Sequence, residues 1–164
     1  MKRYRNNGAI GALLDEYEKA IIELQKVISE VTSIELESIV DRETKDPDCK
    51  SIQTILTHVI RAGRGYVIAI RNSLGEQIEP AQREKLNTVT AYQSGLSSMF
   101  KYNEQLFADY PNLVIEQTDN QKKILTSWGQ LYDVEQLFEH AIVHILRHRR
   151  QIERFLIKLR KDCR

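Results

Sequence analysis

Apolar residues recur along the chain at three- and four-residue steps, the spacing that places side chains on one face of an α-helix. Four stretches show this spacing, at residues 9–32, 52–74, 89–110 and 134–160. Each has polar positions on its other face, as expected of helices that bury one side in a shared core. The pattern predicts an all-α fold, a four-helix bundle.

Residues that cap helices stand where three of these stretches begin. Ser51 precedes the second, Asn87 or Thr88 precedes the third, and Asp133 precedes the fourth. Their side-chain oxygens can accept hydrogen bonds from the first free backbone N–H groups of a helix. We therefore expect the helices to start at these residues.

Two of the three connections are long. Residues 33–50 and 111–131 exceed the roughly two to eight residues that usually join bundle helices, so a simple up-and-down order is not assured. The first is polar and contains Pro47, which disfavours helix at the residue before it. The second has two short apolar pieces, at residues 113–115 and 124–125, with Gly129 after Trp128, and we expect a small extended flap there.

Length and composition favour a single domain spanning residues 1–164. The chain is 41% hydrophobic and 29% charged, with a net charge of +1, so no overall field favours nucleic acid or a membrane as partner. Cys49 and Cys163 lie far apart and form no metal or disulfide pattern, as is typical of a reduced cytoplasmic protein. Asp15 and Glu16 interrupt the first apolar stretch before a signal peptide or membrane span is reached.

The histidines are the most informative chemical feature. The chain has four, and three of them, His140, His144 and His148, recur at four-residue steps in the last predicted helix. Residues four apart on a helix point the same way one turn apart, so two imidazoles there can bind one metal ion.

The helical periodicity selects two of the three. His148 lies closest to the apolar stripe, His144 lies on its flank, and His140 is more exposed. A catalytic zinc ion typically has three protein ligands, which leaves His58 as the third. His58 shares a helix face with a row of small residues, and we interpret this row as a second contact face along which the last helix approaches; the row is Ala62, Gly65 and Ala69.

Two other interpretations remain open. The histidine run lies among many arginines and lysines, so it can equally form a basic helix face that grips phosphates. Residues 147–164 contain eight Lys or Arg against two acidic residues, Glu153 and Asp162. Cys49, nine residues before His58, can pair with it as a nucleophile, although a cysteine in a loop is more often only a small structural residue.

The segments SIQTILTHVIRAGRGY and SWGQLYDVEQLFEHAIVHILRHRRQI resemble the DinB/YfiT-like superfamily of metal-binding four-helix bundles. In that family a histidine early in the second helix joins two histidines of an HxxxHR-x-Q run in the fourth. The matching positions are His58, His144 and His148, the last followed by Arg149 and Gln151. The usual HHRGQ is RHRRQ here, which removes no ligand.

The resemblance implies a divalent metal ion, commonly zinc or nickel, held by His58, His144 and His148. Three imidazoles also suit iron or copper. Relatives include thiol-dependent S-transferases, isomerases and hydrolases, so it implies an enzyme that activates water or a low-molecular-weight thiol against a small-molecule substrate. It also makes a homodimer plausible.

Other side chains are candidates for supporting roles. Arg149, Gln151 and His140 can orient the ligands or contact the substrate, although we favour pairing or solvent exposure for Arg149. Tyr66 and Trp128 can line a pocket, although aromatic residues at helical spacing more often lie in a core. The alternative from another class is a non-enzymatic helical interaction protein whose basic C-terminal helix binds nucleic acid or protein.

Overall fold

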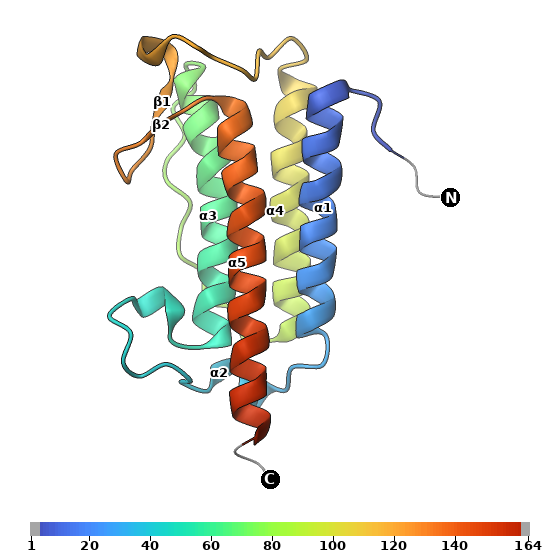
Figure 1. Ribbon diagram of the computed structural model, residues 1–164, viewed down its shortest axis with the longest axis vertical. Helices are drawn as coiled ribbons and strands as arrows, with labels where there is room; N and C mark the ends of the chain where they lie inside the picture. Colours follow the sequence, from blue (N-terminus) through green and yellow to red (C-terminus); the bar gives the residue numbers. More distant parts are fainter. Residues whose placement is uncertain (1–3, 162–164) are drawn as a thin grey trace.

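Four long helices lie side by side in the computed structural model, which describes residues 4–161 (Figure 1). They are α1 (Gly8–Ile28), α3 (Ile52–Ser73), α4 (Val89–Asp109) and α5 (Val134–Lys161). Helices α1 and α5 run in one direction, and α3 and α4 run in the other (Figure 1). The predicted all-α class is confirmed for these residues.

The predicted caps are present at the starts of the helices. The Ser51 hydroxyl accepts a hydrogen bond from the Thr54 backbone N–H (3.1 Å), and the Ser51 N–H donates to the Thr54 hydroxyl (3.0 Å). Thr88, rather than the residue before it, caps α4. The Asp133 carboxylate accepts from the Gln136 N–H (2.8 Å) at the start of α5. Polar side chains thus fix where these helices begin.

The predicted helix at residues 9–32 is too long. The first helix ends earlier, and a second, short helix follows it. Helix α1 ends at Ile28, and α2 spans Ser33–Glu37. The Thr32 hydroxyl accepts from the Glu35 N–H (3.2 Å), and the Glu35 carboxylate accepts from the Thr32 N–H (2.8 Å). This reciprocal capping box starts α2 and allows the chain to turn.

Loops, two 3₁₀ turns and a small hairpin connect the long helices. The loop from residue 75 to residue 88 runs back along α3, so α3 and α4 are parallel (Figure 1). One 3₁₀ turn, η1 (Pro47–Cys49), lies just before α3, and another, η2 (Asn120–Lys122), precedes a hairpin. The hairpin pairs β1 (Ile124–Leu125) with β2 (Leu131–Tyr132) in antiparallel register, with Ile124 opposite Tyr132, which confirms the predicted extended flap.

Aromatic side chains from several helices meet in the core. Tyr17 is fully buried, and its ring packs edge-on against Phe100 (5.8 Å between centroids) and Phe138 (6.2 Å). These contacts tie α1 to α4 and α5. None of the helices within residues 4–161 is long and apolar enough to span a membrane.

Candidate metal centre

Three histidines from two helices converge on one point. His58 comes from the second turn of α3, and His144 and His148 come from successive turns of α5. The His144 Nε2 lies 2.9 Å from the His58 Nε2 and 3.2 Å from the His148 Nε2. One ring nitrogen from each residue lies within 4.8 Å of the others, so the group can hold a metal ion. His144 and His148 are buried, and His58 is half-buried.

The opposite ring nitrogens of two of these histidines are hydrogen-bonded to oxygen atoms. The His58 Nδ1 lies 3.1 Å from a carboxylate oxygen of Asp48, in η1. The His148 Nδ1 lies 3.1 Å from the side-chain oxygen of Gln151, one turn further along α5. Because both oxygens only accept, each Nδ1 carries the proton, and each neutral ring presents an unprotonated Nε2 to the cluster.

The shared region therefore holds more lone pairs than protons. His58 and His148 each direct a lone pair at the His144 Nε2, and that nitrogen can donate one proton at most. At least one of these lone pairs is left without a hydrogen from the protein, which is unfavourable where the ring nitrogens are buried. A cation would satisfy all three nitrogens at once, so this donor set fits a divalent metal ion.

Burial and mutual repulsion keep His144 and His148 uncharged. Burial, then the neighbouring imidazoles His148 and His58, lower the pKa of His144 to about 2. Burial, and then the charge of His58, also lower the pKa of His148. Metal-binding imidazoles must be unprotonated, and both are neutral at pH 7.

Cys49 lies behind the cluster rather than in it. Its thiol is free, and the sulfur lies 3.4 Å from the Asp46 carboxylate and 3.8 Å from the Gln151 oxygen. Burial raises the pKa of this thiol, which makes it a poorer nucleophile. The geometry places Cys49 beside a residue that holds His148, which does not favour the nucleophile interpretation. Cys163 lies outside the described residues.

His140 lies one turn from the cluster, in a group of aromatic side chains. Its ring stacks on Trp128 (5.1 Å between centroids, 20° between planes) and meets Tyr66 edge-on (5.4 Å). Burial, and then the charge of Arg147, lower the pKa of His140. It is half-buried and so more exposed than the buried His144 and His148, as expected, and it is not part of the three-histidine group.

The row of small residues on α3 is a helix contact only in part, because α5 brings His144 to His58 but Gly65 faces open space. A Cβ atom added at Gly65 would have no neighbour within 4 Å. Ala62, Gly65 and Ala69 instead line a cavity of about 780 Å³, bounded also by the hairpin and α5. Periodicity reveals which residues share a face, and it does not reveal whether that face meets a helix or open space.

Arg149 points away from the histidines. Its guanidinium pairs with Glu23 on α1 and lies 3.6 Å from Glu153. Further along α5, Arg160 pairs with Glu35 at 2.8 Å. Two arginines of the basic C-terminal stretch are thus partly neutralised by contacts within the fold.

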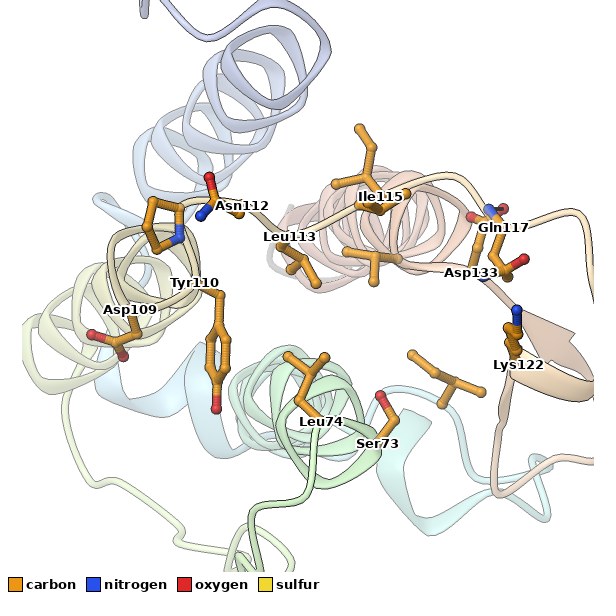
Figure 2. A pocket seen from close by; sticks show the side chains of 14 residues that line it. Ser73, Leu74, Asp109, Tyr110, Asn112, Leu113, Ile115, Gln117, Lys122 and Asp133 are labelled. Atoms are coloured by element: carbon orange, nitrogen blue, oxygen red, sulfur yellow. Dashed lines mark hydrogen bonds between the residues drawn. The ribbon is translucent and has the colours of Figure 1, made fainter.

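A second cavity, of about 520 Å³, lies where α3 and α4 end and α5 begins (Figure 2). Its charged residues already have partners in the described chain. Asp109 binds Arg71 (2.5 Å), Asp133 caps α5, and Lys122 lies 3.8 Å from Asp119. It therefore offers no free chemical group comparable with the histidine cluster.

Sequence reasoning missed Asp48, although it identified the histidines. Asp48 lies in an irregular loop, and its contact with His58 depends on how that loop folds against α3. The only available signal was an acidic residue shortly before the helix that carries His58.

Comparison with family models and with curated proteins gives no match to this chain.

Proposed function

We propose that this chain is a divalent-metal-dependent enzyme, a four-helix bundle of the DinB-like type, with His58, His144 and His148 as its metal ligands. The observation that carries the proposal is the convergence of three histidine nitrogens within 4.8 Å from two different helices. The hydrogen bonds from His58 to Asp48 and from His148 to Gln151 support it, because histidines that bind metal commonly donate their other N–H to an oxygen.

Zinc and nickel are the ions we propose first, since both accept neutral imidazole ligands. When bound, such an ion supplies Lewis-acid chemistry that lowers the pKa of water or of a thiol toward neutrality. The resemblance of the histidine segments to DinB-like proteins favours hydrolysis or transfer of a low-molecular-weight thiol.

The chain's own residues contribute positioning and exclusion of water. Asp48 and Gln151 hold the rings of His58 and His148 in one tautomer. Burial of His144 and His148 keeps bulk water from the back of the cluster. Arg149, paired with Glu23, has no part in this arrangement, whereas His140 belongs to the wall of the adjoining cavity.

Turnover by metal-loaded protein tests the proposal. We expect activity in a panel of ester, amide and thiol-transfer substrates, abolished by a chelator and by His144→Ala. Arg150→Ala, which changes an exposed residue on the same helix, is the matched control and retains activity. Absence of turnover across the whole panel by protein that holds metal would contradict an enzymatic role.

The alternative, nucleic-acid binding by the basic end of α5, has less support, since Arg149 and Arg160 pair with glutamates. Binding to DNA would weaken steeply with salt because neutralised phosphates release counterions. We expect no such salt-dependent binding. A homodimer and a cytoplasmic location remain predictions from the sequence.

A further inference from the structure

The cavity beside the histidines is large enough for a small molecule. Its volume of about 780 Å³ falls in the range of roughly 300–1,000 Å³ typical of ligand sites. His58 and His144 form part of its wall, so a ligand there reaches the candidate metal centre. The remaining wall is mostly apolar and comes from α3, α5, the hairpin and the loop after α3.

Gly65 gives this cavity an open floor that the fold itself does not require. Glycine is unfavourable inside a helix, and the other glycines inside α3 and α4 have a packing reason. A Cβ at Gly63 would lie 1.9 Å from the Met99 sulfur, and one at Gly95 would lie 2.8 Å from Ile60. At Gly65 nothing lies within 4 Å. A side chain there would fill only space that a ligand can use.

One wall of the cavity is aromatic. Tyr66 meets Trp128 edge-on (6.0 Å), and His140 stacks on the Trp128 ring. The indole is 45% exposed, so part of it remains free for a further contact. A planar apolar group can pack against such a surface in an offset or edge-on arrangement.

The charge of the cavity disfavours cationic ligands. None of the described residues that line it is acidic, whereas Arg61 is among them. The Arg61 Nε donates to the Ala81 carbonyl at 3.4 Å, and no carboxylate in the described chain pairs with its guanidinium. The terminal N–H groups of Arg61 are therefore available to an anion.

We propose that this cavity binds a ligand with a planar aromatic group and an anionic end. The aromatic group lies over Gly65 and against Trp128, and Arg61 contacts the anion. The inference rests on the proposed function in one respect, since such a ligand is a substrate only if the neighbouring histidines hold a metal ion.

Fluorescence of Trp128, the single tryptophan of the chain, reports occupancy of the cavity directly. The probes are 4-phenylbutanoate and its cationic counterpart 4-phenylbutylammonium, titrated into chelator-treated and zinc-loaded protein whose metal content is measured. We expect saturable binding of the carboxylate, with a Kd about tenfold lower than that of the ammonium. Arg61→Gln should remove most of this preference for the anion.

Gly65→Leu should abolish binding of 4-phenylbutanoate while circular dichroism shows an intact helical fold. Ala12→Leu makes the same kind of addition on the exposed side of α1 and should leave binding unchanged. Equal binding of both probes, no binding, or unchanged binding in Gly65→Leu would overturn the proposal. Carboxylate binding by protein that takes up no zinc on loading would support the cavity and contradict the proposed metal centre. Uptake of zinc without carboxylate binding would support the metal centre and overturn the cavity proposal.

Discussion

His58 and His144 are 86 residues apart in the sequence, yet their Nε2 atoms lie 2.9 Å apart. The Nδ1 of His58 is held at the same time by Asp48, so the ring cannot turn without losing a hydrogen bond. Two helices and one loop therefore determine the position of a single nitrogen atom. A site built in this way would need little ordering of its ligands to hold a metal ion.

Removal of the Asp48 carboxylate should weaken metal binding without removing a ligand. In Asp48→Ala the His58 ring loses the acceptor that fixes its tautomer, and we expect an affinity about 10- to 100-fold lower. Competition with a chromophoric chelator measures the affinity for zinc. Glu43→Ala, a loss of negative charge at an exposed position of the same loop, is the control. Equal affinities of the two variants would show that Asp48 has no positioning role.

Substitutions of Gln151 and Arg149 should have clearly different effects on metal affinity, although the two residues are only two positions apart. Gln151→Ala removes the acceptor of the His148 Nδ1 and should lower metal affinity. Arg149→Ala breaks an ion pair with Glu23 that is partly exposed, so it should cost about 0–1 kcal/mol of stability and leave metal affinity unchanged. Urea unfolding and chelator competition on both variants measure the two effects. A loss of affinity in Arg149→Ala alone would reverse these assignments.

Two glycines of α3, Gly63 and Gly65, are two positions apart on different sides of the helix and should respond oppositely to alanine. At Gly65 the new methyl group meets nothing within 4 Å, so the gain in helix propensity should stabilise the protein by about 0.5–1 kcal/mol. At Gly63 it would lie 1.9 Å from the sulfur of Met99, which is fully buried and must repack, and we expect a loss of about 1–2 kcal/mol. Chemical denaturation of both variants tests the pair. Stabilisation by Gly63→Ala would show that the core between α3 and α4 is looser than described.

Asp109 should stabilise the fold only above acidic pH. The hydrogen bond from Arg71 and then that from Gln105 hold the pKa of this carboxyl below its ordinary value of 3.8. Its contribution is therefore complete above the pKa of the unfolded chain and is lost as pH falls through the lower pKa of the folded chain. The difference in free energy of unfolding between the parent and Asp109→Asn should be largest near neutral pH and shrink below about pH 4. A difference independent of pH would contradict this.

Local chemistry made the helix starts and the histidine pair predictable. Ser51, Thr88 and Asp133 act through side-chain bonds to neighbouring backbone groups, so their effect is visible in sequence. The separation of His144 and His148 from His140 follows from their angles around one helix. The capping signal of α2, Thr32 with Glu35, is equally local. The prediction missed it because the apolar pattern of residues 9–32 assigned Thr32 to the end of the first helix.

Contacts between distant segments could not be predicted in the same way. The approach of Asp48 to His58 depends on the path of an irregular loop. The cavity over Gly65 depends on where the hairpin and the loop after α3 come to lie. Helical periodicity places these residues on a face, and only tertiary structure decides what that face meets.

The most direct test of the three-histidine site is elemental analysis of untagged protein after reconstitution with zinc or nickel. The parent and His140→Ala should each hold about one ion per chain, as expected for one three-ligand site, whereas His58→Ala and His144→Ala should hold none. His140→Ala is the matched control, because it removes an imidazole from the same helix outside the converging group. A parent protein without metal after reconstitution, or full retention of metal in His58→Ala and His144→Ala, would contradict the proposed centre.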